Sequence, residues 1–396
     1  MLYRHIMKSR HRAPFRFSWQ HPEFRAVLYQ IIVVGLVALA AWYLVSNTLH
    51  NLATRNIATG FAFLDREAGF AIGESVIDYS PSDTYRRAIL VGLVNTLRVS
   101  IVALVFATIL GVIVGIARLS ANWLVSRLAT AYVEFIRNVP LLLQLLIWYA
   151  FIGEVLPGPR SALNPLPGVY MSNRGLLAPA VEGTSLSGIS VGLVIAAIAV
   201  FLVARHQRTR QRATGVQSRL WPWVLGLCLI MPSLGWLLGG QDIHLDLPHR
   251  SGFNFEGGWA FSPELFALLI GLITYTAGFI AEIVRAGIQS VSRGQWEAAQ
   301  SMGLPRGRIL RLVILPQALR VIVPPTTSQY LNVIKNSSLA VAIGYPDLVS
   351  VVNTTLNQTG QAIEGILIIM AAFMTVSLAV SLLMNWYNKR IALVER

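Results

Sequence analysis

The stretch GQWEAAQSMGLPRGRILRLVILPQ, residues 294–317, is the longest polar, motif-like segment between the hydrophobic runs of this chain. Its first part predicts a short helix, because Ser292 and Gln295 have the spacing of a capping box and the alanines favour helix. Gly303 is expected to end that helix in the left-handed conformation, which glycine adopts at little cost. The stretch therefore predicts a short helix followed by a sharp turn.

A second short helix is expected after that turn. Pro305 suits the first position of a helix, and the residues after it place arginines beside leucine, isoleucine and valine. Pro316 is expected to close this helix and to begin the next membrane span. From these physical signals alone, an ordinary amphipathic hairpin at the membrane interface is an alternative interpretation.

The composition of the whole chain places it in a membrane. Of its 396 residues, 55% are hydrophobic and only 13% are charged, and the mean hydropathy of +0.59 is too high for an ordinary soluble domain. Several runs reach the length of about 20 apolar residues that a membrane helix needs. They lie near 27–47, 98–117, 132–153, 186–204, 220–238, 263–284, 318–334 and 363–385. We therefore expect an all-α polytopic membrane protein with about eight transmembrane helices.

The distribution of charge predicts which loops face the cytoplasm. A net charge of +14 could indicate nucleic-acid binding, but the basic residues fall between hydrophobic runs instead of gathering on one accessible face. Arginine and lysine collect before the first run, between the fourth and fifth runs, around residues 294–317 and at the C-terminal end, whereas acidic residues collect in the alternate loops. The positive-inside rule then places both termini and the 294–317 stretch in the cytoplasm.

Catalytic, metal and redox chemistry find no support in the sequence. The single cysteine, Cys228, lies in an apolar run, and there is no CxxC or zinc-ligand spacing. No phosphate-binding GxxxxGK[ST] motif occurs, and the three lysines, Lys8, Lys335 and Lys389, are not in glycine-rich turns. We expect no catalytic residue, metal site or cofactor, and any ATP must be bound by another polypeptide.

The spacing of residues 297–316 resembles the EAA loop of ABC importer membrane subunits, with Val313 at a position that is usually isoleucine. In that family the loop is a coupling helix that docks into a cleft on the cytosolic ATPase. The resemblance implies a permease subunit that is not itself an enzyme, because its partner hydrolyses ATP. The matching positions are Glu297, Ala298, Ala299, Gly303, Leu315 and Pro316.

Three further stretches resemble polar amino-acid ABC permeases of the histidine-permease type: NTLR (95–98), YVEFIRNVPLLLQ (132–144), and IKNSSL (334–339) with IG (343–344). The resemblance implies a five-helix type I importer core, split by an insertion as in the long permeases of general L-amino-acid importers of Gram-negative bacteria. It also implies a bacterial inner-membrane location, an amino-acid substrate, a second and different permease subunit, cytosolic ATPases and a periplasmic substrate-binding protein.

The resemblance divides the chain into four segments. Residues 1–87 are expected to form a basic cytoplasmic N-terminus, an anchor helix and a periplasmic loop. Residues 88–155 form the first part of the core, 156–260 a two-helix insertion with periplasmic loops, and 261–396 the second part with the coupling loop.

Polar side chains inside the spans are candidates for the substrate path. Ionisable groups are costly in a bilayer and usually face a cavity or a partner. A zwitterionic amino acid needs an acid for its ammonium group and donors for its carboxylate, which amides and hydroxyls can also supply. An interfacial ion pair and hydrogen bonds between neighbouring helices are the alternative interpretations. The candidates are Glu282, Arg285, Asn138, Gln144, Asn336 and Ser337.

Two other functional classes remain as alternatives. An ion-coupled secondary transporter would need acidic groups near the middle of the membrane and would have no use for a docking loop, and no internal repeat is visible. A membrane enzyme with its site on an extracytoplasmic loop would need a catalytic constellation, and none is recognisable. Neither alternative accounts for the spacing of residues 297–316.

Overall fold

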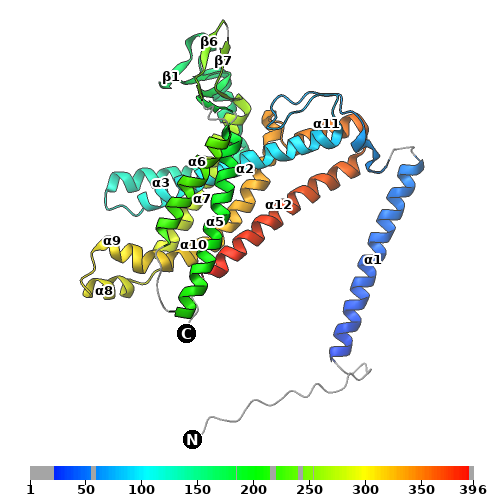
Figure 1. The fold of residues 1–396 in the computed structure, drawn as a ribbon. Helices are drawn as coiled ribbons and strands as arrows, with labels where there is room; N and C mark the ends of the chain where they lie inside the picture. The colour runs from blue at the N-terminus through cyan, green and yellow to red at the C-terminus, as the bar shows by residue number, and fades with distance from the viewer. Residues whose placement is uncertain are drawn as a thin grey trace.

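The computed structural model describes residues 22–54, 59–183, 185–214, 220–239, 244–252 and 254–391, and within these ranges the chain is mainly helical (Figure 1). The predicted N-terminal charge cluster lies outside the described residues. The α-helices are α1 Pro22–Thr54, α2 Tyr85–Ala117, α3 Trp123–Asn138, α4 Leu141–Ala150, α5 Ser185–Thr214, α6 Trp221–Leu238, α7 Pro263–Gln289, α8 Arg293–Ser301, α9 Arg306–Ile309, α10 Leu315–Asn336, α11 Leu348–Thr359 and α12 Ala362–Ile391. Short 3-10 or π-helical turns are η1 Phe61–Asp65, η2 Phe151–Val155, η3 Pro159–Ser161, η4 Leu310–Ile314 and η5 Ser337–Ile343.

The predicted membrane architecture is confirmed for the described residues, with corrections to two spans. Seven helices are long and apolar enough to cross a membrane, and the count reaches eight when α3 and α4 are taken as one span. The second helix begins at Tyr85, not near residue 98, because the Thr84 hydroxyl accepts a hydrogen bond from the Arg87 amide (3.4 Å) and caps it. The predicted straight span at 132–153 is wrong. The chain bends by 104° before α4, where Pro140 disfavours helical geometry in the residue before it.

The core of the protein surrounds α7. This helix packs most extensively against α2 and also contacts α3, α4 and α10. Glycines on α2 allow the close approach, because a Cβ atom at Gly111 would lie 2.7 Å from Ile280 and one at Gly115 would lie 2.8 Å from the Ala281 carbonyl oxygen. Side chains such as Leu268 are fully buried along this seam.

The segment between α4 and α7 contains a helical hairpin. α5 and α6 pack on each other so closely that a Cβ atom at Gly188 would lie 2.2 Å from the Gly235 carbonyl oxygen. Little of either helix is buried, since the apolar window of α5 is 11% buried and that of α6 is 0% buried. The hairpin is therefore held together by its own two helices.

A small β-module stands at one end of this hairpin (Figure 1). All its strand pairs are antiparallel, in sheets ordered β1-β2-β3-β8, β4-β5 and β6-β7. The β3–β8 and β4–β5 pairs join the chain before α5 to the chain after α6. The sequence analysis did not predict these strands, which lie outside the spans. They are β1 Leu163–Leu166, β2 Val169–Ser172, β3 Gly175–Ala178, β4 Ala180–Glu182, β5 His244–Asp246, β6 His249–Ser251, β7 Asn254–Glu256 and β8 Trp259–Phe261.

The loop after α1 and the short helix α11 pack over the start of α2. Phe63 of the loop is buried in one cluster with Tyr85 of α2 and Val351 of α11. Asp347 caps α11, because its carboxylate accepts a hydrogen bond from the Ser350 amide (2.8 Å). By contrast, α1 stands apart from the other helices in Figure 1, and none of its apolar window is buried.

Candidate functional site

The chain after α7 folds as two short helices around a glycine turn. α8 follows Ser292, whose side chain makes no capping hydrogen bond, so the predicted capping box is wrong. The Gly303 amide donates to the Gln300 carbonyl (2.8 Å), and the Leu304 amide donates to the Ala299 carbonyl (3.4 Å). Gly303 has a φ angle of 70°, so the predicted left-handed turn is confirmed.

The second short helix differs from its prediction at both ends. Pro305 precedes α9 as its cap and is not its first helical residue. α9 then continues through the π-helical turn η4 into α10, with Pro316 in the first turn of α10. Pro316 therefore begins the next helix, as predicted, but does not close a separate one, because proline is compatible with a first helical turn.

One face of this segment packs on the core and the other is exposed. Ala299 is 4% exposed and joins a buried cluster that includes Ile280 of α7 and Ile309 of α9. The neighbouring Glu297 and Ala298 are exposed, as are Gly303, Leu315 and Pro316. The structure therefore anchors α8 through one small side chain and leaves its other face accessible to another chain.

Glu282 and Arg285 form an ion pair near the end of α7 that leads to α8. Arg285 donates to the carboxylate of Glu282 through Nε (3.1 Å) and Nη2 (2.5 Å). Arg118, at the end of α2, donates to the same carboxylate and also to the Thr130 hydroxyl of α3 (3.4 Å). Both oxygens of Glu282 are thus engaged. The sequence analysis missed Arg118, which ends an apolar run without indicating which carboxylate it faces.

Asn138 and Gln144 flank the bend between α3 and α4. The side-chain amide of Gln144 donates to the carbonyl oxygens of Ile136 (3.0 Å) and Val139 (2.9 Å). It thereby satisfies backbone acceptors that the bend leaves without a helical partner. Gln144 is 5% exposed, whereas Asn138 is exposed at the end of α3.

Asn336 and Ser337 lie where α10 tightens into the 3-10 turn η5. Ser337 is buried, and its hydroxyl donates to the Ile334 carbonyl oxygen (2.7 Å). Asn336 is half-buried. Because α4 contacts η5, the two irregular segments that carry four of the predicted path residues are neighbours. Glu282 and Arg285 belong to the separate ion cluster on α7.

A second ion cluster ties the beginning of α7 to α2. Glu74, in the loop after η1, accepts hydrogen bonds from Arg98 of α2 (2.8 Å) and from the hydroxyl of Ser262 (2.7 Å), which also caps α7. The side-chain amide of Asn95 donates to the carbonyl oxygens of Glu74 (2.8 Å) and Pro346 (2.9 Å). The sequence analysis missed this cluster because Glu74 lies in a loop that carries no motif.

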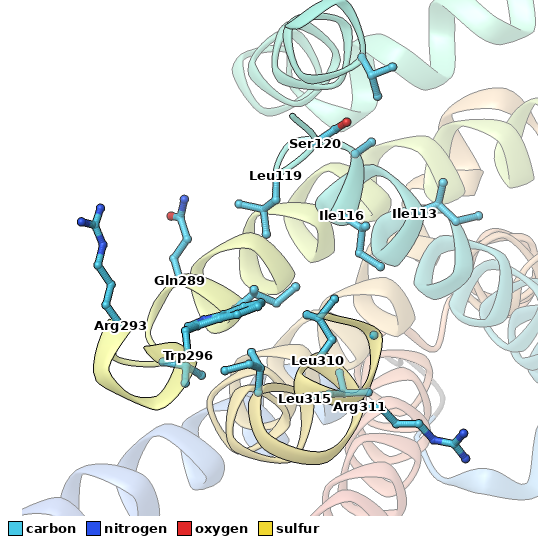
Figure 2. A pocket seen from close by; sticks show the side chains of 16 residues that line it. Ile113, Ile116, Leu119, Ser120, Gln289, Arg293, Trp296, Leu310, Arg311 and Leu315 are labelled. Atoms are coloured by element: carbon cyan, nitrogen blue, oxygen red, sulfur yellow. The ribbon is translucent and has the colours of Figure 1, made fainter. Parts of the chain in front are cut away.

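An open groove of about 1090 Å³ lies beside α8, between the ends of α2 and α7 and the turn η4 (Figure 2). Its walls are mainly apolar and include Leu119 and Leu310. Figure 2 shows the indole of Trp296 turned into the groove from α8. Arg293 and Arg311 are the charged residues among those that line it.

Comparison with protein families establishes the class of this chain. Residues 107–393 match the family described as "Binding-protein-dependent transport system inner membrane component". The match covers well over half of the chain, so the chain belongs to this family and is a permease subunit of an ABC importer. The resemblance noted in the sequence is thereby confirmed at the level of the family.

Relatives match the chain almost from end to end. The permease protein YhdX of Escherichia coli (strain K12) is 51% identical over 382 residues, 96% of this chain and 97% of the relative. The general L-amino acid transport system permease protein AapQ of Rhizobium johnstonii is 45% identical over 383 residues, 96% of each chain. Among solved structures, the "Crystal structure of an amino acid ABC transporter with histidines" covers 77% of this chain and 95% of its own, with 20% identity and a TM-score of 0.46.

Proposed function

We propose that this permease subunit translocates L-amino acids, most of them polar, across the bacterial inner membrane, with both of its termini in the cytoplasm. The names of its relatives support this substrate class. AapQ is named for general L-amino acid transport, and BztB of Rhodobacter capsulatus, 42% identical over 97% of this chain, is named for glutamate, glutamine, aspartate and asparagine. Membership of a binding-protein-dependent family argues against the ion-coupled carrier.

The observation that carries the coupling proposal is the exposed face of α8 beside the Gly303 turn. We assign this face to the cytosolic ATPase, with Glu297 and Ala298 in contact and Ala299 fastening α8 to the core. The remaining residues of the proposed coupling loop, Gly303, Leu315 and Pro316, set the turn and the start of α10.

The path from the docked helix into the membrane is short. Because α8 follows α7 directly, a displacement of α8 on ATP binding acts on α7 first. The close contacts of Gly111 and the ion cluster of Glu282 then carry the motion to α2. Alternation between outward-open and inward-open arrangements of the core is the proposed transport cycle.

The proposed complex contains a second, different permease subunit and an extracytoplasmic substrate-binding protein. Two distinct relatives in Escherichia coli O6:H1, GltJ and GltK, are both named as glutamate/aspartate import permeases, which supports a heteromeric pair. The family description names a binding protein. In this scheme residues 88–155 and 261–396 form the core, 1–87 supply the anchor and 156–260 form the insertion.

The proposed substrate path runs between α4 and η5. The contact between these segments groups Asn138, Gln144, Asn336 and Ser337 around two helix irregularities, where backbone groups become available to a ligand. Glu282 and Arg285 remain candidates for its inner end, and the variants described in the Discussion separate that role from a structural one.

The coupling proposal is tested by Gly303→Val. Valine at a φ angle of 70° introduces strain of about 1 kcal/mol or more, and the turn should shift and misplace α8. We expect the complex to assemble while stimulation of ATP hydrolysis by the loaded binding protein, together with uptake, is lost.

The matched control is Gly360→Val, between α11 and α12. Gly360 has a φ angle of 72°, and at both positions an added Cβ atom meets nothing within 4 Å, so the two substitutions introduce similar strain. Gly360→Val should keep stimulated ATP hydrolysis. Normal stimulation in Gly303→Val, or equal loss in both variants, would contradict the coupling role.

A further inference from the structure

We propose that the groove beside α8 binds one anionic phospholipid, with an acyl chain between α2 and η4 and the headgroup phosphate at the rim formed by Arg293 and Gln289. This site is distinct from the face of α8 assigned to the ATPase and from the proposed substrate path between α4 and η5.

The walls of the groove call for an apolar occupant. Ile116 of α2 is 54% exposed, Leu310 of η4 is 42% exposed and Leu315 of α10 is 43% exposed, and all three line the same open space. Contiguous apolar surface of this kind is unfavourable in water. Because α2 and α7 both end here, the groove lies where the hydrocarbon of the membrane meets the headgroups. A lipid chain is the apolar material present at that level.

The charges around the groove select an anionic headgroup. No carboxylate is among its lining residues, whereas Arg293 and Arg311 are. Figure 2 shows Arg293 and Gln289 together on one side of the groove and Arg311 on the other. An arginine near the membrane surface attracts anionic lipid, and a phosphate also accepts hydrogen bonds from guanidinium and amide groups. Trp296 between them has the amphipathic side chain typical of the interface.

The location gives the lipid a connection to α8. Arg293 and Trp296 belong to α8, whereas Ile116 and Leu119 belong to the end of α2 and the turn after it. A lipid in the groove therefore contacts α8 and α2 at once and reinforces a junction that is otherwise made by small side chains such as Ala299.

The experiment measures lipid binding directly and does not depend on transport. The delipidated permease complex is titrated with phosphatidylglycerol or with phosphatidylcholine, and the bound lipids are counted by native mass spectrometry. We expect one phosphatidylglycerol to bind more tightly than phosphatidylcholine. Arg293→Gln should weaken phosphatidylglycerol binding about fivefold, the contribution expected of one basic residue near an anionic lipid.

A second variant blocks the groove sterically. Gly307 lines the groove, and a Cβ atom there meets nothing within 4 Å, so Gly307→Leu is expected to fold and to occupy the space of the acyl chain. It should abolish the tightly held lipid. The controls are Arg308→Gln and Gly294→Leu, which change the same residue types in α9 and α8 outside the lining of the groove.

Three results would overturn the proposal. The first is equal affinity for the two lipids, and the second is binding that neither Arg293→Gln nor Gly307→Leu reduces. The third concerns another occupant: a photo-crosslinker at Leu119 in the complete importer that captures the ATPase or the second permease instead of lipid shows that a protein fills the groove.

Discussion

The α2–α7 pair and the α5–α6 pair use the same local device in different surroundings. In both, a glycine lets one helix approach the backbone of the other, at Gly111 in the first pair and at Gly188 in the second. The apolar window of α7 is 56% buried and other core helices pack around it, whereas that of α6 is 0% buried. The first pair is fastened by ion clusters at two levels, and the second by β-strands beyond one end.

The contrast separates what a glycine contact does from what the pair is used for. Close packing fixes two helices to each other in either place. Only in α2–α7 does a change in that packing reach α8, because α7 leads into α8 and its side chains share a buried cluster with Ala299. Damage to the two pairs should therefore differ in reach more than in local severity.

The largest effect is expected from Gly111→Leu. A Cβ atom at this position would already lie 2.7 Å from Ile280, so the added side chain must separate α2 from α7, at a cost of about 3 kcal/mol. The yield and the thermal stability of the purified complex should both fall sharply.

The matched change is Gly188→Leu in the hairpin, where the Cβ atom would lie 2.2 Å from the Gly235 carbonyl oxygen. It should disturb α5 and α6 but leave an assembled complex with amino-acid uptake. If Gly188→Leu abolishes assembly as completely as Gly111→Leu, the hairpin is an integral part of the core and the contrast fails.

A smaller effect is expected from Glu282→Gln. The side chain of Glu282 is 26% exposed, and removal of its charge leaves Arg118, whose side chain is 11% exposed, without a counter-charge. The expected loss of stability is about 1–3 kcal/mol, below that of a fully buried pair. Complex yield, thermal stability and uptake are the measurements.

The double variants distinguish a structural role of Glu282 from a role in the substrate path. Removing Arg118 as well, as Arg118→Gln, should restore stability better than Arg285→Gln, because the side chain of Arg285 is 30% exposed and tolerates the loss of its partner. Recovery of both yield and uptake in a double variant assigns Glu282 a structural role. Recovery of yield without uptake supports its place in the substrate path.

At the other ion cluster, Arg98→Gln should have a more local effect. It removes the 2.8 Å contact to Glu74 but leaves the hydrogen bond from Ser262 and the packing of Phe63 in place. We expect about 1 kcal/mol or less, since the pair is partly exposed. Hydrogen exchange should become faster in residues 61–79 and stay unchanged in α8. Faster exchange in α8 would show that the two clusters are strongly coupled.

The smallest effect concerns pH. Burial raises the pKa of Asp347 from 3.8 to about 7, so the folded protein binds this proton more tightly than the unfolded chain does. The stability of α11 should be greatest below the unfolded pKa and fall as the pH rises towards 7, because the buried carboxylate then ionises. Asp347→Asn keeps a capping oxygen and should flatten this dependence, measured by hydrogen exchange in α11. An equal slope in both proteins would exclude Asp347 as its source.

Membrane spans were predictable because hydrophobic length is a property of the chain itself. The turn at Gly303 was predictable for a similar reason, since its left-handed backbone needs glycine at one position. The bend at Pro140 was also present in the sequence, but a continuous apolar run on both sides concealed it. α11 was not predicted because it is too short to span a membrane and is partly polar.

The contacts between distant segments could not be derived from spacing. Arg118 and Glu282 are 164 residues apart, and Glu74 and Ser262 are 188 residues apart, so their pairing depends on how the helices pack. The capping box failed for a related reason, because a correct pair of residues does not ensure that the hydroxyl of Ser292 turns towards the helix. The strands of the β-module are three or four residues long, below the length at which alternation is recognisable.

The pairing of β3 with β8 and of β4 with β5 brings both ends of the hairpin segment to the same side of the membrane. The chain therefore enters and leaves this segment on one side, having crossed the bilayer an even number of times. Parity makes the addition neutral for everything that follows, since α7 keeps its direction and α8 keeps its side. One extra crossing in place of two would have turned α8 to the opposite side of the membrane, where there is no ATP to use.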